Sequence, residues 1–432
     1  MRTNFSAAQL TVPQIADAEK SLRACMHCGI CTATCPTYVL LGDERDSPRG
    51  RIVMMQRMLE DGGTPSAESV LHVDRCLSCL ACRTACPSSV DYARLVDAAR
   101  AHIQEHYSRP AGDRLLRWLI ARIMTRPALV SVSLLAARLF APVVRKLPGR
   151  LKTMAEMGLA LDRASSPKIA SNPSRGARRI ALMPGCVQAA IAPEIDAAAA
   201  RVLARRGFAL VPLEGAGCCG SLVHHMGRER EAINWAKRAI EAFERANEGD
   251  PFEAVTITAT GCGAHLKDIA HLFKGDAEWE PRAKGFAAKF RDFSELASPR
   301  RSWPPERLRV AYHAACSAQN GLSLQGRPET LLKEAGFEVF AVPEGHLCCG
   351  AGGAYSILQP EIAAQLRTRK LANIESLKPD VIATGNVGCL NQLSGPDAPP
   401  VVHVAELLDW VEGGVKPKAL LKRRMAQAAA KG

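Results

Sequence analysis

The sequence predicts a multidomain protein of mixed α and α/β class, with a helical N-terminal domain followed by two copies of one α/β module. Two observations carry this prediction. The first is a run of four cysteines that occurs twice with identical spacing, CMHCGICTATCP at 25–36 and CLSCLACRTACP at 76–87. The second is a longer repeat, offset by about 130 residues, in which four cysteines per copy follow short apolar stretches.

Composition narrows the class of protein. The chain has 432 residues, of which 47% are hydrophobic and 23% charged, an ordinary balance for a soluble globular protein with several domains. Sixteen cysteines are a high count, and the segment MRTNFSAAQLTVPQIADAEK at the start has no apolar secretory core. We therefore expect a cytoplasmic protein whose cysteines are metal ligands or redox centres rather than disulfides.

The net charge of +13 favours anionic partners. Aromatic residues make up only 5% of the chain and no nucleic-acid-binding motif is recognised, so nucleic acid is not expected as a partner. An anionic membrane face or an acidic partner subunit suits the charge better. A basic surface that simply keeps the protein soluble is the alternative.

The helical domain is predicted for residues 1–108. The stretch DSPRGRIVMMQRMLEDGG between the cysteine runs predicts a helix, with Pro48 near its start and Gly62 after its end. DYARLVDAARAHIQEHY predicts another. We therefore expect a mostly helical ferredoxin-like domain rather than a small β-rich one.

A basic, largely helical connector is predicted for residues 109–176. Its apolar stretch PALVSVSLLAARLFAPVV, residues 127–144, is interrupted by Arg138, which argues against a membrane span. A helix packed on its own protein is favoured over contact with a membrane surface.

The two α/β modules are predicted for 177–306 and 307–412, and a basic tail for 413–432. Their flanking sequences agree, for example RRIALMPGC with RLRVAYHAAC. Short apolar stretches before the cysteines predict buried strands, and patterns such as PEIDAAAARVLARRG predict helices between them, so the sheets should be parallel. We expect the cysteines in loops at the strand ends. They are Cys186, Cys218, Cys219 and Cys262 in the first copy and Cys316, Cys348, Cys349 and Cys389 in the second.

The spacing C-x2-C-x2-C-x3-C-P is typical of a [4Fe–4S] ligand run whose fourth cysteine serves the other cluster. It predicts cluster one on Cys25, Cys28, Cys31 and Cys86, and cluster two on Cys76, Cys79, Cys82 and Cys35. Structural zinc, the alternative, typically uses two separated C-x2-C pairs. Such clusters move single electrons, so the bond-making chemistry is expected elsewhere. No G-x-G-x-x-G placed between a strand and a helix indicates a flavin or nicotinamide site.

The adjacent cysteines of the repeat leave three interpretations open. The four thiols of a module can hold a further iron–sulfur centre or zinc, form a redox-active pair, or be simply buried. Four histidines lie near them in the sequence, and the pattern singles out none as a ligand. They are His224, His225, His313 and His346.

Two such runs followed by two CCG modules resemble the iron–sulfur subunits of flavin-linked 2-hydroxyacid oxidoreductases, above all those of glycolate oxidase (glycolate dehydrogenase). HLCCGAGGAYS at 346–356 and TGNVGCLNQ at 384–392 are the segments most similar to that family, and the likeness extends over about residues 17–412. It implies two [4Fe–4S] clusters and FAD-carrying partner subunits that oxidise glycolate to glyoxylate. It also implies a membrane acceptor, quinone, and a place on the cytoplasmic face of the inner membrane. No catalytic residue is assigned to this chain.

Related CCG proteins supply the alternatives, which are an iron–sulfur subunit of a lactate or other 2-hydroxyacid dehydrogenase and a heterodisulfide-reductase-like thiol–disulfide oxidoreductase. The chain departs from the heterodisulfide reductase pattern, which ends in CxxC. Here His265 follows Cys262 and Gln392 follows Cys389 at that distance. The missing cysteines favour the oxidase subunit.

Overall fold

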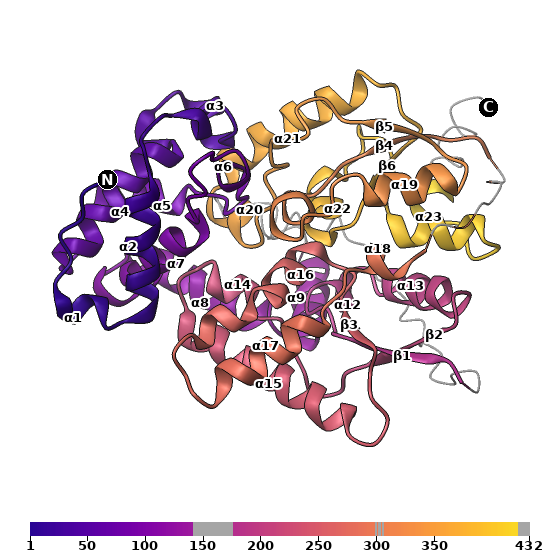
Figure 1. Ribbon diagram of the computed structural model, residues 1–432. Helices are drawn as coiled ribbons and strands as arrows, with labels where there is room; N and C mark the ends of the chain where they lie inside the picture. Colours follow the sequence, from indigo (N-terminus) through magenta and orange to yellow (C-terminus); the bar gives the residue numbers. More distant parts are fainter. Residues whose placement is uncertain (141–175, 299, 301–303, 305, 422–432) are drawn as a thin grey trace.

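The computed structural model describes residues 1–140, 176–298, 300, 304 and 306–421, and shows a helical N-terminal domain beside two α/β modules (Figure 1). The predicted fold class is confirmed. The part of the predicted connector after residue 140 and the end of the predicted basic tail lie outside the described residues.

The N-terminal domain packs its longer helices around a core that includes Leu22, Met55 and Leu95. Its elements are α1 (Ala7–Leu10), α2 (Pro13–Ala24), η1 (Ile30–Thr32), α3 (Pro36–Leu41), η2 (Glu44–Asp46), α4 (Pro48–Asp61), α5 (Ala67–Asp74), α6 (Ala81–Thr84) and α7 (Tyr92–His106). Helix α4 begins as predicted, because the Ser47 hydroxyl accepts from a first-turn amide and Pro48 is the first helical residue. It ends at Gly62, whose φ of 65° is left-handed.

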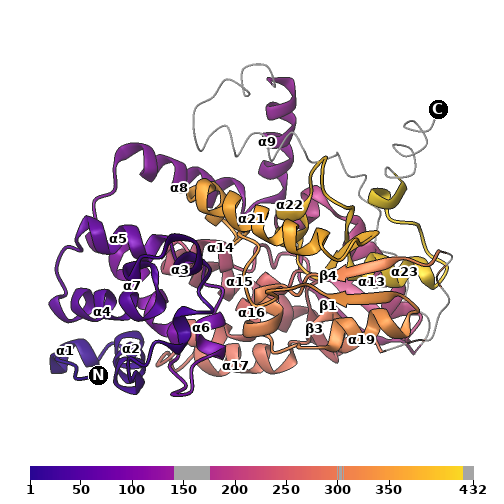
Figure 2. The same ribbon diagram turned by 90° about the horizontal axis from the view of Figure 1, so that it is seen from above.

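Two helices follow, α8 (Ala111–Ile123) and α9 (Pro127–Leu139). Helix α8 buries Leu116 and Ile120 in the core of the first module. Helix α9 stands out from the body (Figure 2), and Val130 is its only buried residue. Helix α9 is thus far less packed than the sequence predicts. No single described helix is long and apolar enough to cross a membrane, although α8 and α9, bent by 117°, meet that test of length and composition together.

The first module has a parallel three-stranded sheet in the order β2-β1-β3, made of β1 (Arg178–Leu182), β2 (Phe208–Pro212) and β3 (Ala254–Thr256). The flanking elements are α12 (Gln188–Ile191), α13 (Glu194–Ala204), α14 (Ser221–His224), α15 (Glu229–Asn247), α16 (Thr260–Lys267), η3 (Ile269–Phe273), α17 (Trp279–Lys289) and α18 (Phe293–Leu296).

The second module repeats this order as β5-β4-β6 and adds β7, again all parallel. Its strands are β4 (Arg309–Tyr312), β5 (Glu338–Ala341), β6 (Val381–Thr384) and β7 (Val401–His403). Its other elements are η4 (Ser317–Gly321), α19 (Arg327–Glu334), α20 (Tyr355–Leu358), α21 (Pro360–Glu375), α22 (Val387–Leu393) and α23 (Val404–Val411).

Strand order explains why the cysteines gather. In each sheet the first strand of the module is central, so the chain leaves it toward one neighbour and later returns to the other side. The loops after neighbouring strands therefore run in opposite directions, and they leave an opening at the carboxyl edge of the sheet. Two cysteines differ from the predicted loop positions, since Cys262 and Cys389 lie in the first turns of α16 and α22, which begin soon after their strands.

Candidate metal centres

The two cysteine runs fold in the same way. The residues two and four positions after the first cysteine are left-handed in both runs: His27 (φ 57°) and Gly29 (φ 80°) in one, Ser78 (φ 51°) and Leu80 (φ 58°) in the other. Left-handed residues other than glycine are strained and gather at functional sites. The repeated spacing therefore produces the same backbone wrap twice.

These wraps surround two adjoining hollows. The first hollow is lined by Cys25, Cys28, Cys31, Cys82 and Cys86, and the second by Cys35, Cys76, Cys79 and Cys82. The structure thus brings together the cysteines predicted for each cluster, including the crossed fourth members, Cys86 and Cys35. The assignment of individual ligands stays a prediction.

The chemistry of these thiols fits an iron–sulfur cluster. All sixteen cysteines of the chain lie in the described residues and are free. Burial raises the pKa of Cys31 to about 11 and raises the pKa values of Cys79 and Cys82 as well. Such sulfurs become thiolates only beside a strong positive charge, which the iron of a cluster would supply.

The first hollow opens to the surface. Cys28 is exposed, and the side chains of Met26 and Ile30 beside it are 80% and 53% exposed. Gly29 has a φ of 80°, a left-handed conformation that residues with a side chain rarely adopt. The first hollow therefore presents its sulfurs to whatever binds this face.

The second hollow is lined by less exposed cysteines than the first. Cys35 and Cys76 are buried, and the buried guanidinium of Arg51 reaches the Sγ of Cys35 with Nη1 at 3.7 Å. Arg51 also donates to the hydroxyl of Thr37 at 3.0 Å and to the carbonyl of His72 at 2.7 Å. A charged donor therefore faces the sulfur predicted to complete cluster two.

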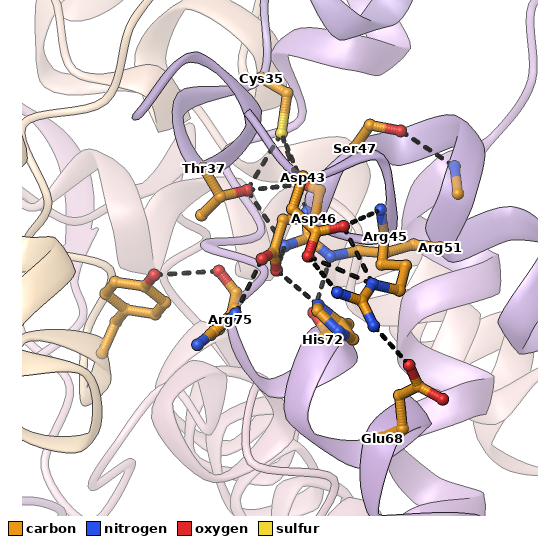
Figure 3. A network of polar contacts seen from close by, with 12 residues as sticks. Cys35, Thr37, Asp43, Arg45, Asp46, Ser47, Arg51, Glu68, His72 and Arg75 are labelled. Atoms are coloured by element: carbon orange, nitrogen blue, oxygen red, sulfur yellow. Dashed lines mark hydrogen bonds and ion pairs between the residues drawn. The ribbon is translucent and has the colours of Figure 1, made fainter. Parts of the chain in front are cut away.

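Asp46 balances this charge (Figure 3). Its fully buried carboxylate accepts from Arg51 at 3.1 Å and from Arg75 at 2.8 Å, and Nδ1 of His72 lies 3.0 Å away. Its backbone carbonyl accepts from Thr37. Sequence analysis missed this network, because the charged stretch between the cysteine runs offers many pairings and does not reveal which acid is buried.

The second hollow also touches the second module. Asn320 donates to the carbonyl of Cys79 at 2.9 Å and accepts from Thr84 at 2.8 Å. The hydroxyl of Tyr355 donates to the carbonyl of Arg75 at 2.9 Å. An apolar cluster extends across the same boundary and includes Leu77, Cys79, Cys316, Cys348 and Tyr355. The predicted cluster two and the cysteine pair of the second module are therefore neighbours.

The second module brings its own donors together. The Sγ atoms of Cys349 and Cys389 are 3.4 Å apart, and those of Cys316 and Cys348 are 3.9 Å apart. The ring of His313 joins Cys349 and Cys389 in a buried group whose ligand atoms all lie within 4.8 Å of one another. Burial lowers the pKa of His313 to about 3, so its ring is neutral near pH 7.

The first module has the same four cysteines but no histidine in the place of His313. Cys186 and Cys218 have Sγ atoms 3.5 Å apart, but Met183 stands at the position that corresponds to His313. Its half-buried His265 has an Nε2 without a partner, and the ring of His265 lies 5.2 Å from that of buried His224. Among the described residues, the cysteines of the first module form no three-donor group like that of the second.

The other three histidines that the sequence placed near the cysteine pairs do not join a group with the thiols. His224 and His225 form a group with Asp97 of the N-terminal domain. His346 is exposed. Only His313 is thus placed among thiols in a three-donor group, a distinction that its position in the sequence did not make.

Comparison with known proteins agrees with this division of the chain. The family model for the 4Fe-4S dicluster domain matches residues 24–90, and the cysteine-rich domain (CCG) matches residues 180–267 and again 310–394. A crystal structure of a hypothetical protein from Helicobacter pylori has a similar fold, with a TM-score of 0.52 at 10% identity, covering 95% of this chain and 74% of that one.

Two relatives are informative. The lactate utilization protein A of Anoxybacillus flavithermus is 30% identical over 225 residues, which cover 50% of this chain and 92% of that protein. The glycolate oxidase iron-sulfur subunit of Escherichia coli is 36% identical over 415 residues, which cover 95% of this chain and 98% of that protein. The chain therefore belongs to the family of glycolate oxidase iron–sulfur subunits, proteins with a dicluster domain followed by two CCG domains.

Proposed function

We propose that this chain is the electron-transfer subunit of a glycolate-oxidising complex. A partner subunit that carries FAD oxidises glycolate to glyoxylate, and the electrons pass through two [4Fe–4S] clusters of this chain to quinone in the membrane. The observation that carries the proposal is the pair of adjoining thiol-lined hollows, one with an exposed cysteine, Cys28, and one with two buried cysteines, Cys35 and Cys76.

The clusters supply one-electron oxidation and reduction when bound. The eight N-terminal cysteines hold them, four on each, with Cys35 and Cys86 as the crossed ligands. Cys82 lines both hollows, so the path between them is short. Arg51 donates toward Cys35 and favours added negative charge in the second hollow.

The flavoprotein binds over the first hollow. Exposed Met26 and Ile30 supply apolar contact area there, and Cys28 lies at the same surface. An electron can reach the predicted cluster one from this face without crossing the protein. The second hollow is covered by the second module and is reached afterwards.

The membrane face is the pair α8–α9. Residues 109–140 contain six arginines and one acid, Asp113, which is paired with Arg109 and Arg117. Val132 and Leu139 of α9 are 62% and 70% exposed, and Trp118 of α8 is half exposed. Apolar and basic side chains on projecting α9 and on the exposed side of α8 suit an anionic lipid surface, so the chain is peripheral on the cytoplasmic face of the inner membrane.

Lactate is the alternative substrate, favoured by the likeness to lactate utilization protein A. The substrate is bound by the partner subunit, so the architecture of this chain serves either acid. The thiol–disulfide oxidoreductase is less favoured, because six of the eight cysteines of the CCG modules are buried, although pairs of them lie close together.

The test is substrate-dependent dye reduction by the complex that this chain captures anaerobically from native membranes. Glycolate and D-lactate are compared on the same preparation, and bound flavin is measured. We expect a flavoprotein to be captured and glycolate to drive reduction. Reduction by lactate alone would overturn the glycolate assignment, and capture of no flavoprotein would overturn the subunit role.

A further inference from the structure

We propose that one zinc ion binds between the N-terminal domain and the first module, on Asp97, His224 and His225. The site uses no cysteine and is separate from the two hollows and from the cysteine pairs of the modules. It does not depend on which acid the complex oxidises. It rests on three side chains that converge across a domain boundary, on donors that lack other partners, and on a backbone contact that fixes them.

The three donors come from two units of the chain. Asp97 lies in α7 of the N-terminal domain, whereas His224 is the last residue of α14 in the first module and His225 follows it. Their ligand atoms all lie within 4.8 Å of one another. Two imidazoles and one carboxylate are a donor set that zinc takes in proteins, with water at the fourth position. The fold therefore assembles from both units a set that neither unit holds alone.

These donors lack other partners. The carboxylate of Asp97 forms no hydrogen bond or ion pair with the residues that the structure describes. The Nδ1 atom of His225 is buried and has no hydrogen-bond partner. Polar groups that meet inside a protein are usually paired with one another or with a bound species. A metal ion among the three side chains would be the common partner that they lack.

The two arginines near Asp97 are engaged elsewhere. Arg94 donates to both carboxylate oxygens of Asp268, at 2.7 and 2.6 Å. Arg100 donates to the hydroxyl of Ser78 at 2.5 Å and to a backbone carbonyl of the second cysteine run, also at 2.5 Å. Neither guanidinium is thus paired with Asp97. A bound cation would supply the countercharge that the carboxylate does not receive from these arginines.

The side chains are in the forms that bind a metal. Burial lowers the pKa of His224 to about 4 and lowers the pKa of His225 as well, so both imidazoles are neutral near pH 7. Burial raises the pKa of Asp97 only to about 6, so its carboxylate is mostly ionised there. Metal ligands of these types bind as neutral imidazole and as carboxylate. No proton has to leave the imidazoles before zinc binds near pH 7.

A close backbone contact holds the donors in place. Gly227, two residues after His225, has a φ of 80°, and a Cβ there would lie 2.2 Å from the carbonyl oxygen of Arg100. That oxygen belongs to the backbone and cannot swing aside as a side chain can, so glycine is needed for the turn after α14 to lie directly on α7. Asp97 and Arg100 are three residues apart and share one face of α7. The turn that carries the histidines is therefore fixed against the face that carries Asp97.

The experiment uses the full chain, purified anaerobically with both clusters in place and incubated with zinc alone before removal of the excess. Zinc is counted by elemental analysis in the wild type and in His225→Ala, so that zinc held at any other site cancels in the difference. X-ray absorption at the zinc edge identifies the ligands of the zinc that the variant lacks. We expect the wild type to hold one more zinc per chain, with nitrogen and oxygen ligands and no sulfur.

Three further variants sharpen the comparison. Asp97→Asn keeps the shape of the side chain but removes its charge, and it should weaken the zinc affinity of this site roughly tenfold or more. Asp97→His supplies an imidazole at the same place, so it should keep the zinc and replace one oxygen ligand by nitrogen. His106→Ala removes an exposed imidazole from the end of the same helix and should leave the zinc unchanged.

Iron content and the electron paramagnetic resonance (EPR) spectrum of the clusters show whether each variant is folded. If His225→Ala does not fold, Asp97→Asn takes its place in the comparison. The proposal is overturned if the folded variant holds as much zinc as the wild type. It is equally overturned if the zinc that is lost has sulfur ligands, or if His106→Ala lowers the zinc content as much as His225→Ala does.

Discussion

The two cysteine runs share one spacing and one backbone wrap but have opposite surroundings. The first hollow opens to solvent beside Met26 and Ile30. The second hollow is bordered by the buried Asp46–Arg51 pair and by the second module, and two of its cysteines are buried. The ligand pattern therefore decides what is bound, whereas the surrounding residues decide what each centre can reach. The following predictions test that difference, from the largest expected effect to the smallest.

Removal of the buried acid should damage the second hollow most. Asp46→Ala leaves Arg51 buried without its carboxylate, which costs about 3–5 kcal/mol. We expect a lower denaturation midpoint and loss of about half of the bound iron. Glu44→Ala, which removes an exposed partner of Arg49, is the matched control and should cost about 0–1 kcal/mol. Equal effects of the two changes would contradict the role assigned to Asp46.

Access from solvent should distinguish the two clusters. A bulky hydrophilic oxidant such as ferricyanide should destroy the cluster of the first hollow in an early phase, because Cys28 is exposed. The cluster of the second hollow, behind Asn320 and Tyr355, should persist into a later phase. Iron release and the EPR signals follow both phases. A single phase that removes all iron would show that the two surroundings do not differ in access.

Arg51 should set the reduction potential of the second cluster. Arg51→Lys keeps the charge but cannot reach Cys35, Thr37 and the His72 carbonyl at once. Loss of a charged donor to the sulfur should lower that potential by roughly 60 mV, equivalent to about 1.4 kcal/mol for one electron. A redox titration followed by EPR measures both clusters. If only the potential of the first cluster falls, Arg51 does not act on the second cluster, and this assignment is wrong.

The smallest effect is expected where the second module contacts the N-terminal domain. Tyr355→Phe removes the hydrogen bond to the Arg75 carbonyl and should lower stability by about 1 kcal/mol, with both clusters retained. Tyr38→Phe, on a half-buried side chain of α3, is the control. Thermal unfolding followed by circular dichroism compares the two. If Tyr355→Phe is no less stable than the control, this bond does not join the two units.

Local rules explain what the sequence could predict. Pro48 and Gly62 bound a helix through backbone constraints that act within a few residues, and α4 begins and ends there. Apolar stretches before the cysteines predicted strands, and the repeat predicted two modules with parallel sheets, which the structure shows. These features depend on neighbours in the chain or on a pattern that occurs twice.

Long-range pairing explains what the sequence could not predict. Thr84 occupies a position that the cysteine motif leaves unspecified, and its partner Asn320 lies 236 residues further along the chain. The stretch around Asp46 holds several acids and bases, and only the fold decides that Asp46 and Arg51 are the buried pair. His313 was one of four candidate histidines until the sheet placed it beside Cys349.

The measurement that tests the central claim most directly is EPR of Cys28→Ser in the anaerobic complex with its flavoprotein after addition of glycolate. The variant should lose the cluster of the first hollow, where the electron is proposed to enter. The account predicts that the flavin becomes reduced while the cluster of the second hollow stays oxidised. Reduction of the second cluster in this variant would contradict entry through the open hollow, and failure of flavin reduction would contradict the order of the relay.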